Sequence, residues 1–156
     1  VLDTRKTTPL LRFLEKRAVV LGGGVNHRFG LYDMILIKDN HVDYAGSISN
    51  AVKNALRYRK EKGIHIPIEV EVRNFEELRE LLMCEEVDRV MFDNFSPDQV
   101  KEAVNLVQGK FVTEASGGID LSTIRSYALA GVDYVSVGAL THSVKSLDLS
   151  LKAKLI

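Results

Sequence analysis

The chain has 156 residues, 46% of them hydrophobic, which is enough to bury one sizeable core in a single domain, residues 1–156. Its 21 basic and 21 acidic side chains cancel, so composition excludes bulk electrostatic attraction to nucleic acid or to an anionic membrane. No signal segment opens the chain, no apolar run approaches the roughly 18 residues of a membrane span, and Cys84 has no cysteine partner, so we expect a cytoplasmic protein.

The first part of the chain is basic. Residues 1–38 contain seven Lys or Arg residues against three acidic ones, an excess of four positive charges that the remainder cancels. A solvated basic face is the commoner cause of such an excess. It is also the pattern expected near the site of an anionic small ligand.

After a glycine-rich patch at residues 21–25, short apolar runs alternate with amphipathic segments. The three glycines of the patch have neither dinucleotide-binding nor Walker spacing, so we interpret them as a flexible connection. From the second run onward the starts lie a little over twenty residues apart, which is room for one strand, one helix and two short loops. The predicted strands cover residues 34–37, 66–72, 90–92, 111–115 and 134–137.

The predicted helices have recognisable start and stop signals. Capping boxes mark two of the starts, at Asn74 with Glu77 and at Ser96 with Gln99. Glycines follow three of the segments and can end them. The predicted helices lie between residues 47 and 63, 74 and 82, 96 and 109, and 121 and 131.

Strands that are apolar on both faces and alternate with helices imply a parallel sheet covered by helices, so the predicted class is α/β. A full eight-unit barrel needs about 250 residues, whereas this chain has five clear units and room for one more strand at its start. We therefore predict an open or incomplete parallel (β/α) barrel, TIM-like, with about six strands. A doubly wound open sheet is the alternative, because strand order cannot be read from sequence.

Polar residues of kinds that carry out chemistry follow every predicted strand. The carboxyl ends of parallel strands lie on one side of a sheet, so we expect these residues to converge on one site. Each residue alone has a simpler explanation as a loop or turn former. Glu69 and Glu71 are two positions apart and therefore share a face, where two carboxylates need cations or a metal. The residues are Lys38, Glu69, Glu71, Asp93, Asn94, Glu114, Ser116, Gly117, Gly118 and Gly138.

Two loops of small residues follow the last two predicted strands. Gly117 and Gly118 let the backbone approach a ligand, and their amides together with the next helix N-terminus suit phosphate. Residues 137–143 form the second loop, at a position where phosphate sites in such barrels are common.

The histidines lack zinc-ligand spacing, whereas a Glu and an Asp on neighbouring strand ends suit Mg²⁺.

Seven motifs, in order and with compatible spacing, resemble the quinolinate phosphoribosyltransferases, the decarboxylating nicotinate-nucleotide pyrophosphorylases. The resemblance implies phosphoribosyl transfer from phosphoribosyl pyrophosphate to quinolinate with decarboxylation, giving nicotinate mononucleotide, pyrophosphate and CO₂ in NAD biosynthesis. The motifs are DTRKTTP (3–9), NHR (26–28), IKDNH (37–41), EVEV (69–72), FDNF (92–95), EASGGI (114–119) and GALTHS (138–143).

The resemblance also implies a basic pocket for the two quinolinate carboxylates. Planar diacids call for forked guanidinium contacts and several positive charges, which agrees with the basic excess. Either Lys6 or Lys38 can stabilise charge during decarboxylation, and we expect Asp39, Asn40 and His41 on a loop at the pocket mouth. The pocket residues are Arg5, Lys6, His27, Arg28 and Lys38.

For the donor, the resemblance implies that Glu71 and Asp93 bind the ribose hydroxyls and the Mg²⁺ that accompanies pyrophosphate. Family matching selects Glu71 over Glu69. The 5′-phosphate would lie on the two small-residue loops, with His142 lining the same region. The catalytic set is then Lys6, Lys38, Glu71 and Asp93, and the phosphate set is Ser116, Gly117, Gly118, Gly138 and Ala139.

The family has an N-terminal domain ahead of the first motif, and this chain starts almost at that motif. In the family this domain of a partner subunit lends an arginine to the acceptor site, so we expect this chain alone to be inactive and the homodimer or larger homo-oligomer to form through that domain. Two alternatives stay open. One is a related phosphoribosyltransferase with another acceptor, and the other is an inactive phosphate-binding or assembly fragment.

Overall fold

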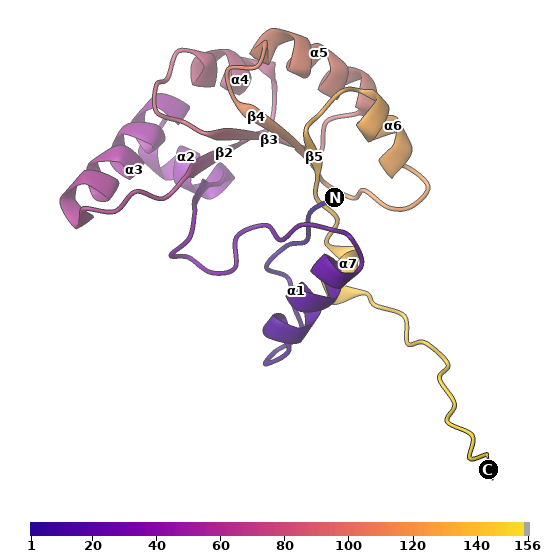
Figure 1. Cartoon of the computed structure of the whole chain (residues 1–156). Coiled ribbons are helices and arrows are strands. Elements are labelled where there is room, and N and C mark those ends of the chain that lie inside the picture. The colour runs from indigo at the N-terminus through magenta and orange to yellow at the C-terminus, as the bar shows by residue number, and fades with distance from the viewer. Residues whose placement is uncertain (155–156) are drawn as a thin grey trace.

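The computed structural model describes residues 1–154 and has a five-stranded parallel sheet at its centre (Figure 1). The strands are hydrogen-bonded in chain order, each to the next. This confirms the α/β class and the partial TIM-like barrel; the doubly wound alternative is wrong, because its strand order would reverse at a switch point. The strands are β1 (Ile35–Ile37), β2 (Ile68–Val72), β3 (Arg89–Asp93), β4 (Val112–Ser116) and β5 (Tyr134–Val135).

Four helices cover one face of this sheet (Figure 1). Ser96 and Gln99 form the predicted capping box, but at Asn74 only half of the box forms, because the Glu77 carboxylate accepts from the Arg73 N–H instead. The last of these four helices begins three residues later than predicted, after a turn held by Asp120. The helices are α3 (Ile48–Lys62), α4 (Phe75–Leu82), α5 (Pro97–Val107) and α6 (Ile124–Leu129).

Three further helices were not predicted: α1 (Arg12–Leu21), α2 (Asp39–Ala45) and α7 (Ala139–His142). The expected loop at Asp39, Asn40 and His41 is wrong, because these residues form the first turn of α2. The start of α2 is capped by a histidine, since the Lys38 N–H donates to His41 Nδ1 at 2.9 Å. Sequence rules for capping look for Ser, Thr, Asp, Glu or Gln and so pass over this device.

The two faces of the sheet differ sharply. The face toward the helices is apolar, and Val70, Phe92 and Ala115 on it are fully buried. Strand register places alternate residues on the opposite, inner face, so the expectation of strands apolar on both faces is wrong. The inner-face residues include Leu36, Glu69, Glu71, Met91, Asp93, Glu114, Ser116 and Ser136.

The expected sixth strand is reduced to isolated bridges in the described residues. Leu2 pairs in parallel with Val25 on one side and Ser136 on the other, continuing the sheet beyond β5 by one residue. The Leu2 N–H donates to the Val135 carbonyl at 2.8 Å, and the Leu2 carbonyl accepts from Val137 at 3.0 Å. The barrel is therefore incomplete between this segment and β1.

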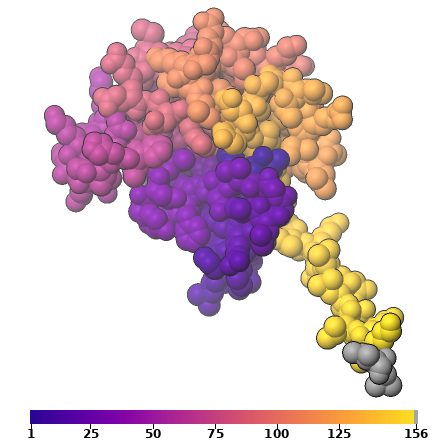
Figure 2. Space-filling model, viewed as in Figure 1, coloured from indigo at the N-terminus to yellow at the C-terminus, as the bar shows by residue number. Residues whose placement is uncertain are grey.

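The N-terminal segment and α1 pack together beside the sheet, whereas residues 143–154 form no helix or strand and extend away from the domain (Figure 2). None of the helices within residues 1–154 combines the length and the apolarity that a membrane crossing requires.

Candidate active site

A cleft of about 920 Å³ lies on the inner face at the carboxyl ends of the strands. It receives side chains from the N-terminal segment, from strand ends and from α7, which are far apart in the sequence. A smaller groove of about 520 Å³ beside β1, α2 and α3 contains none of the predicted carboxylates. The cleft is lined by all thirteen predicted site residues: Arg5, Lys6, His27, Arg28, Lys38, Glu71, Asp93, Ser116, Gly117, Gly118, Gly138, Ala139 and His142.

A buried ion pair holds the first two motifs against each other. Lys16 Nζ donates to Asp3 Oδ1 at 2.6 Å and to the His27 carbonyl at 3.0 Å. The same Asp3 oxygen accepts from the His27 N–H at 2.8 Å. Lys16 is 1% exposed, so its positive charge is paired with Asp3 inside the protein and does not face a ligand. Sequence alone does not distinguish Lys16 from Arg17, the exposed basic residue beside it on α1.

The basic side of the cleft contains two neighbouring guanidinium groups. Burial and the nearby charge of Arg5 lower the pKa of Arg28, while Glu69 and Asp33 oppose that effect. Arg5 Nε is buried without a hydrogen-bond partner. The backbone of Lys6 is fixed by α7, because Thr141 Oγ1 donates to the Lys6 carbonyl at 2.8 Å. Like charges held this close favour an anion between them.

The acidic side consists of Glu71 and Asp93 on neighbouring strands. Burial raises the pKa of Glu71, and the charge of Asp93 adds to that effect, while Lys38 opposes it with Nζ 3.4 Å from Oε2. Asp93 accepts from the Asn94 amide at 2.8 Å. Two carboxylates that repel each other and face one cleft are a donor set that fits Mg²⁺, which prefers oxygen ligands.

The backbone of the first small-residue loop requires both of its glycines, whereas Gly138 in the second loop is limited by a side-chain contact. Gly117 has φ +104° and Gly118 has φ +60°, the left-handed region. A Cβ on Gly117 would overlap the Asn94 side chain and lie 2.8 Å from the Asn94 nitrogen, and one on Gly138 would lie 2.8 Å from His142 Nε2. Asn94, with φ 58°, is the turn former that packs against Gly117.

Several further residues line the cleft beyond the thirteen to which the sequence analysis gave a substrate-binding role. Three of them lie at alternate strand positions beside predicted ones, so the two-residue strand period identifies them once a neighbour is known to face the cleft. Asp120 closes the phosphate-side loop by accepting from the Ser122 and Thr123 N–H groups. The additional residues are Thr4, Leu36, Asp39, Met91, Asn94, Ile119, Asp120 and Ser136.

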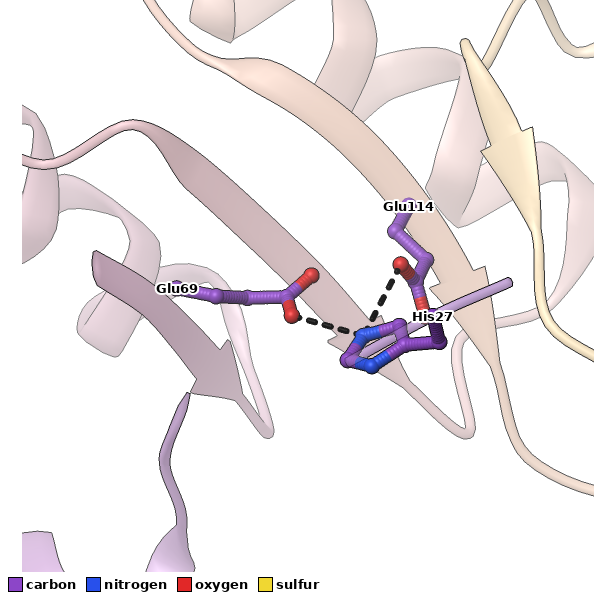
Figure 3. A group of neighbouring side chains, drawn as sticks. All are labelled: His27, Glu69 and Glu114. Carbon is purple, nitrogen blue, oxygen red and sulfur yellow. Dashed lines mark ion pairs between the residues drawn. The ribbon is translucent and has the colours of Figure 1, made fainter. Parts of the chain in front are cut away.

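Below the floor of the cleft, His27 faces two carboxyl groups (Figure 3). His27 Nε2 lies 2.8 Å from Glu69 Oε2 and 3.5 Å from Glu114 Oε2. Both glutamates are 0% exposed and His27 is 7% exposed. The sequence identified Glu69 and Glu114 as polar strand residues but not their contact with His27.

Fold and site together define a partial α/β barrel with a charged cleft at the carboxyl ends of its strands, the arrangement typical of barrel enzymes. The chain belongs to the quinolinate phosphoribosyl transferase family, because residues 1–152 match "Quinolinate phosphoribosyl transferase, C-terminal domain". The resemblance found in the motifs is thereby confirmed.

Relatives agree with this assignment. The chain is 52% identical to a probable nicotinate-nucleotide pyrophosphorylase of Bacillus subtilis, covering 99% of this chain and 52% of that protein. It is 46% identical to the chloroplastic nicotinate-nucleotide pyrophosphorylase of Arabidopsis thaliana, covering 97% and 48%. The chain thus spans about half the length of the curated relatives it matches. Since that plant relative is named as chloroplastic, a cytoplasmic location stays a prediction for this chain.

Solved structures agree as well. NadC from Streptococcus pyogenes superposes with a TM-score of 0.89 at 45% identity, covering 97% of this chain and 52% of that one. The nicotinate-nucleotide pyrophosphorylase from Francisella tularensis superposes with a TM-score of 0.88 at 46% identity, covering 96% of this chain and 51% of that one.

Proposed function

We propose that this domain carries the active site for phosphoribosyl transfer from phosphoribosyl pyrophosphate to quinolinate, with decarboxylation to nicotinate mononucleotide in NAD biosynthesis. One observation carries the proposal: a single cleft combines a cationic side, a carboxylate pair and two glycine loops. Each of these parts suits a different portion of the two substrates. Relatives named for this activity, with about half their length matched, support it.

The cationic side is suited to the acceptor. Quinolinate is a planar diacid, and a carboxylate between Arg5 and Arg28 would offset both the burial of Arg28 and its repulsion by Arg5, which together lower the pKa of Arg28. Lys6 and Lys38 supply two more positive charges on the same cleft. This number of cations favours a diacid over the acceptor with one carboxylate that a related phosphoribosyltransferase would use.

The carboxylate pair and the loops are suited to the donor. Glu71 and Asp93 would hold Mg²⁺ and the ribose hydroxyls, and the metal would supply charge neutralisation for pyrophosphate. The 5′-phosphate would lie on the glycine loops, because a side chain at Gly117 or Gly138 would collide with its neighbours and leave no room for close backbone approach. His142 lies at the edge of this region.

The protein's own contribution is positioning and electrostatics. Fixed charges would stabilise an oxocarbenium-like ribosyl centre and the departing pyrophosphate. For the later loss of the acceptor's 2-carboxylate, we assign charge stabilisation to Lys6, because Lys38 is already paired with Glu71 and no carboxylate within residues 1–154 pairs with Lys6.

The test is calorimetric titration with quinolinate and with phosphoribosyl pyrophosphate plus Mg²⁺, using this domain joined to the N-terminal half of a matched relative. We expect both ligands to bind, and the assembly to be a homodimer or larger homo-oligomer through that half. Binding of nicotinate in preference to quinolinate would identify another acceptor. Failure to bind either ligand would overturn the enzyme proposal in favour of an assembly domain.

A further inference from the structure

We propose that Glu69 and Glu114 are positioning residues that hold His27 as a neutral ring, protonated on Nε2, in the floor of the cleft. The effect of this arrangement on substrate rests on the proposed function, but the arrangement itself does not. It makes His27 a fixed, uncharged part of the acceptor pocket, in place of the fifth cation that the sequence motifs imply.

The tautomer follows from the hydrogen bonds of the ring. The Arg28 N–H donates to His27 Nδ1 at 2.8 Å, so Nδ1 is an acceptor and carries no proton. The remaining ring proton is then on Nε2, which faces Glu69 and Glu114 (Figure 3). Because Nδ1 is unprotonated, the imidazole is neutral.

The backbone of His27 is fixed independently of its ring. Its N–H donates to Asp3 at 2.8 Å, and its carbonyl accepts from Lys16 at 3.0 Å. Asp3 and Lys16 are 0% and 1% exposed. The side chain therefore leaves a rigid main chain, and the two glutamates decide the state of the ring's far end.

The glutamates need a proton between them. All four of their carboxyl oxygens, and His27 Nε2 with them, are buried without a hydrogen bond of good geometry, and two ionised carboxylates there would be strongly destabilising. Burial, followed by the charge of Glu69, raises the pKa of Glu114 to about 9. Glu114 therefore holds a proton, and His27 Nε2 faces the nearer of the two carboxyl groups, with Glu69 Oε2 at 2.8 Å.

A metal ion held by the same three side chains is the competing explanation, since their ligand atoms lie within 4.8 Å of one another. A metal on Nε2 would move the ring proton to Nδ1, where it would point at the Arg28 N–H. Two donors would then face each other inside the protein. The hydrogen bond at Nδ1 thus favours the shared proton over the metal.

The primary test is nitrogen NMR of histidine-labelled protein without substrate, with His27→Gln used to assign the signal. We expect an Nε2–H tautomer for His27. The tautomer is expected to persist in both Glu69→Gln and Glu114→Gln, because Nδ1 still accepts from the Arg28 N–H and a Gln oxygen can still accept from Nε2. A protonated ring, an Nδ1–H tautomer, or a His27 signal that moves on adding Zn²⁺ or Mn²⁺ would overturn the proposal.

A kinetic test uses the protein joined to the N-terminal half. Glu69→Gln and Glu114→Ala should each raise the KM for quinolinate about tenfold with little change in the KM for the donor, and Glu114→Gln should recover most of that loss. The exposed Glu102→Gln is the matched control. Lack of turnover in the unmodified protein would refute the proposed function but not the proposed state of His27, because the NMR measurement needs no substrate. Turnover with equal KM values in all variants would refute the positioning role alone.

Discussion

The two faces of one sheet contrast in this domain. Toward α3, α4 and α5 the strands present Val70, Val90 and Phe92, which are fully buried among apolar side chains. Toward the cleft the same strands present Glu69, Glu71 and Asp93. Alternate residues of a single strand therefore serve two purposes, one the stability of the fold and the other the chemistry of the site.

The contrast shows that burial alone does not define the core. Glu69 and Glu114 are as buried as Phe92, yet they lie on the face where a hydrocarbon side chain would remove a charged contact. Burial of apolar side chains on the outer face stabilises the fold. Burial of charged side chains on the inner face costs free energy, which the outer face offsets. Substitutions on the two faces should accordingly change different measurements.

The largest effect is expected on the outer face. Phe92→Ala should lower the free energy of unfolding by about 3–5 kcal/mol, because it opens a cavity where Phe92 packs on Phe95 with ring centroids 5.5 Å apart. Urea unfolding measures this change. Met91→Ala, its neighbour on the inner face, should cost less than half as much, since Met91 borders the cleft. Equal losses at both positions would contradict the division of the two faces.

On the inner face, Arg28→Ala should weaken quinolinate binding by about 2 kcal/mol, roughly thirtyfold, while donor binding changes little. The reason is the loss of a charge-assisted contact in a partly buried position. Titration calorimetry gives both affinities, and Arg17→Ala on the exposed side of α1 is the control. An equal loss for both ligands would assign Arg28 to the fold or to the donor side.

Glu71→Ala should reverse this pattern. Donor binding in the presence of Mg²⁺ should weaken roughly tenfold, about 1.4 kcal/mol, with a smaller effect on quinolinate. Removal of Mg²⁺ should then make little further difference to the variant. The exposed Glu76→Ala serves as the control. A variant whose donor affinity still responds to Mg²⁺ as the unmodified protein does would rule out Glu71 as a ligand.

The last prediction concerns pH. Burial, followed by Glu69, raises the pKa of Glu114 from an ordinary 4.5 to about 9, so between these values the folded protein holds a proton that the unfolded chain releases. Stability from this group is present at low pH and falls as pH rises through that window. Glu114→Gln removes the dependence, so the variant should become progressively more stable relative to the unmodified protein as the pH rises from 5 to 8. Thermal unfolding at both pH values measures it, and parallel profiles would argue against the raised pKa.

Local signals in the sequence predicted much of this molecule. Apolar runs and capping residues placed five strands and four of the helices, and the polar residue at each strand end indicated where the site lies. The misses have local causes as well. The start of α2 is capped by a histidine that no capping rule includes, and α1 has no side-chain cap at all.

Three-dimensional contacts decided the rest. Sequence spacing showed that Glu69 and Glu71 share a face, but only the curvature of the sheet brings Glu69 beside His27 and Glu114 while Glu71 lies beside Lys38. Lys16 and Lys38 both belong to the basic first part of the chain. Lys16 forms a buried ion pair with Asp3, whereas Lys38 lines the cleft. The periodicity of a strand tells which residues share a face, because that depends on the backbone alone. Which partner each charge meets depends on residues far away in the sequence, and only folding brings those together.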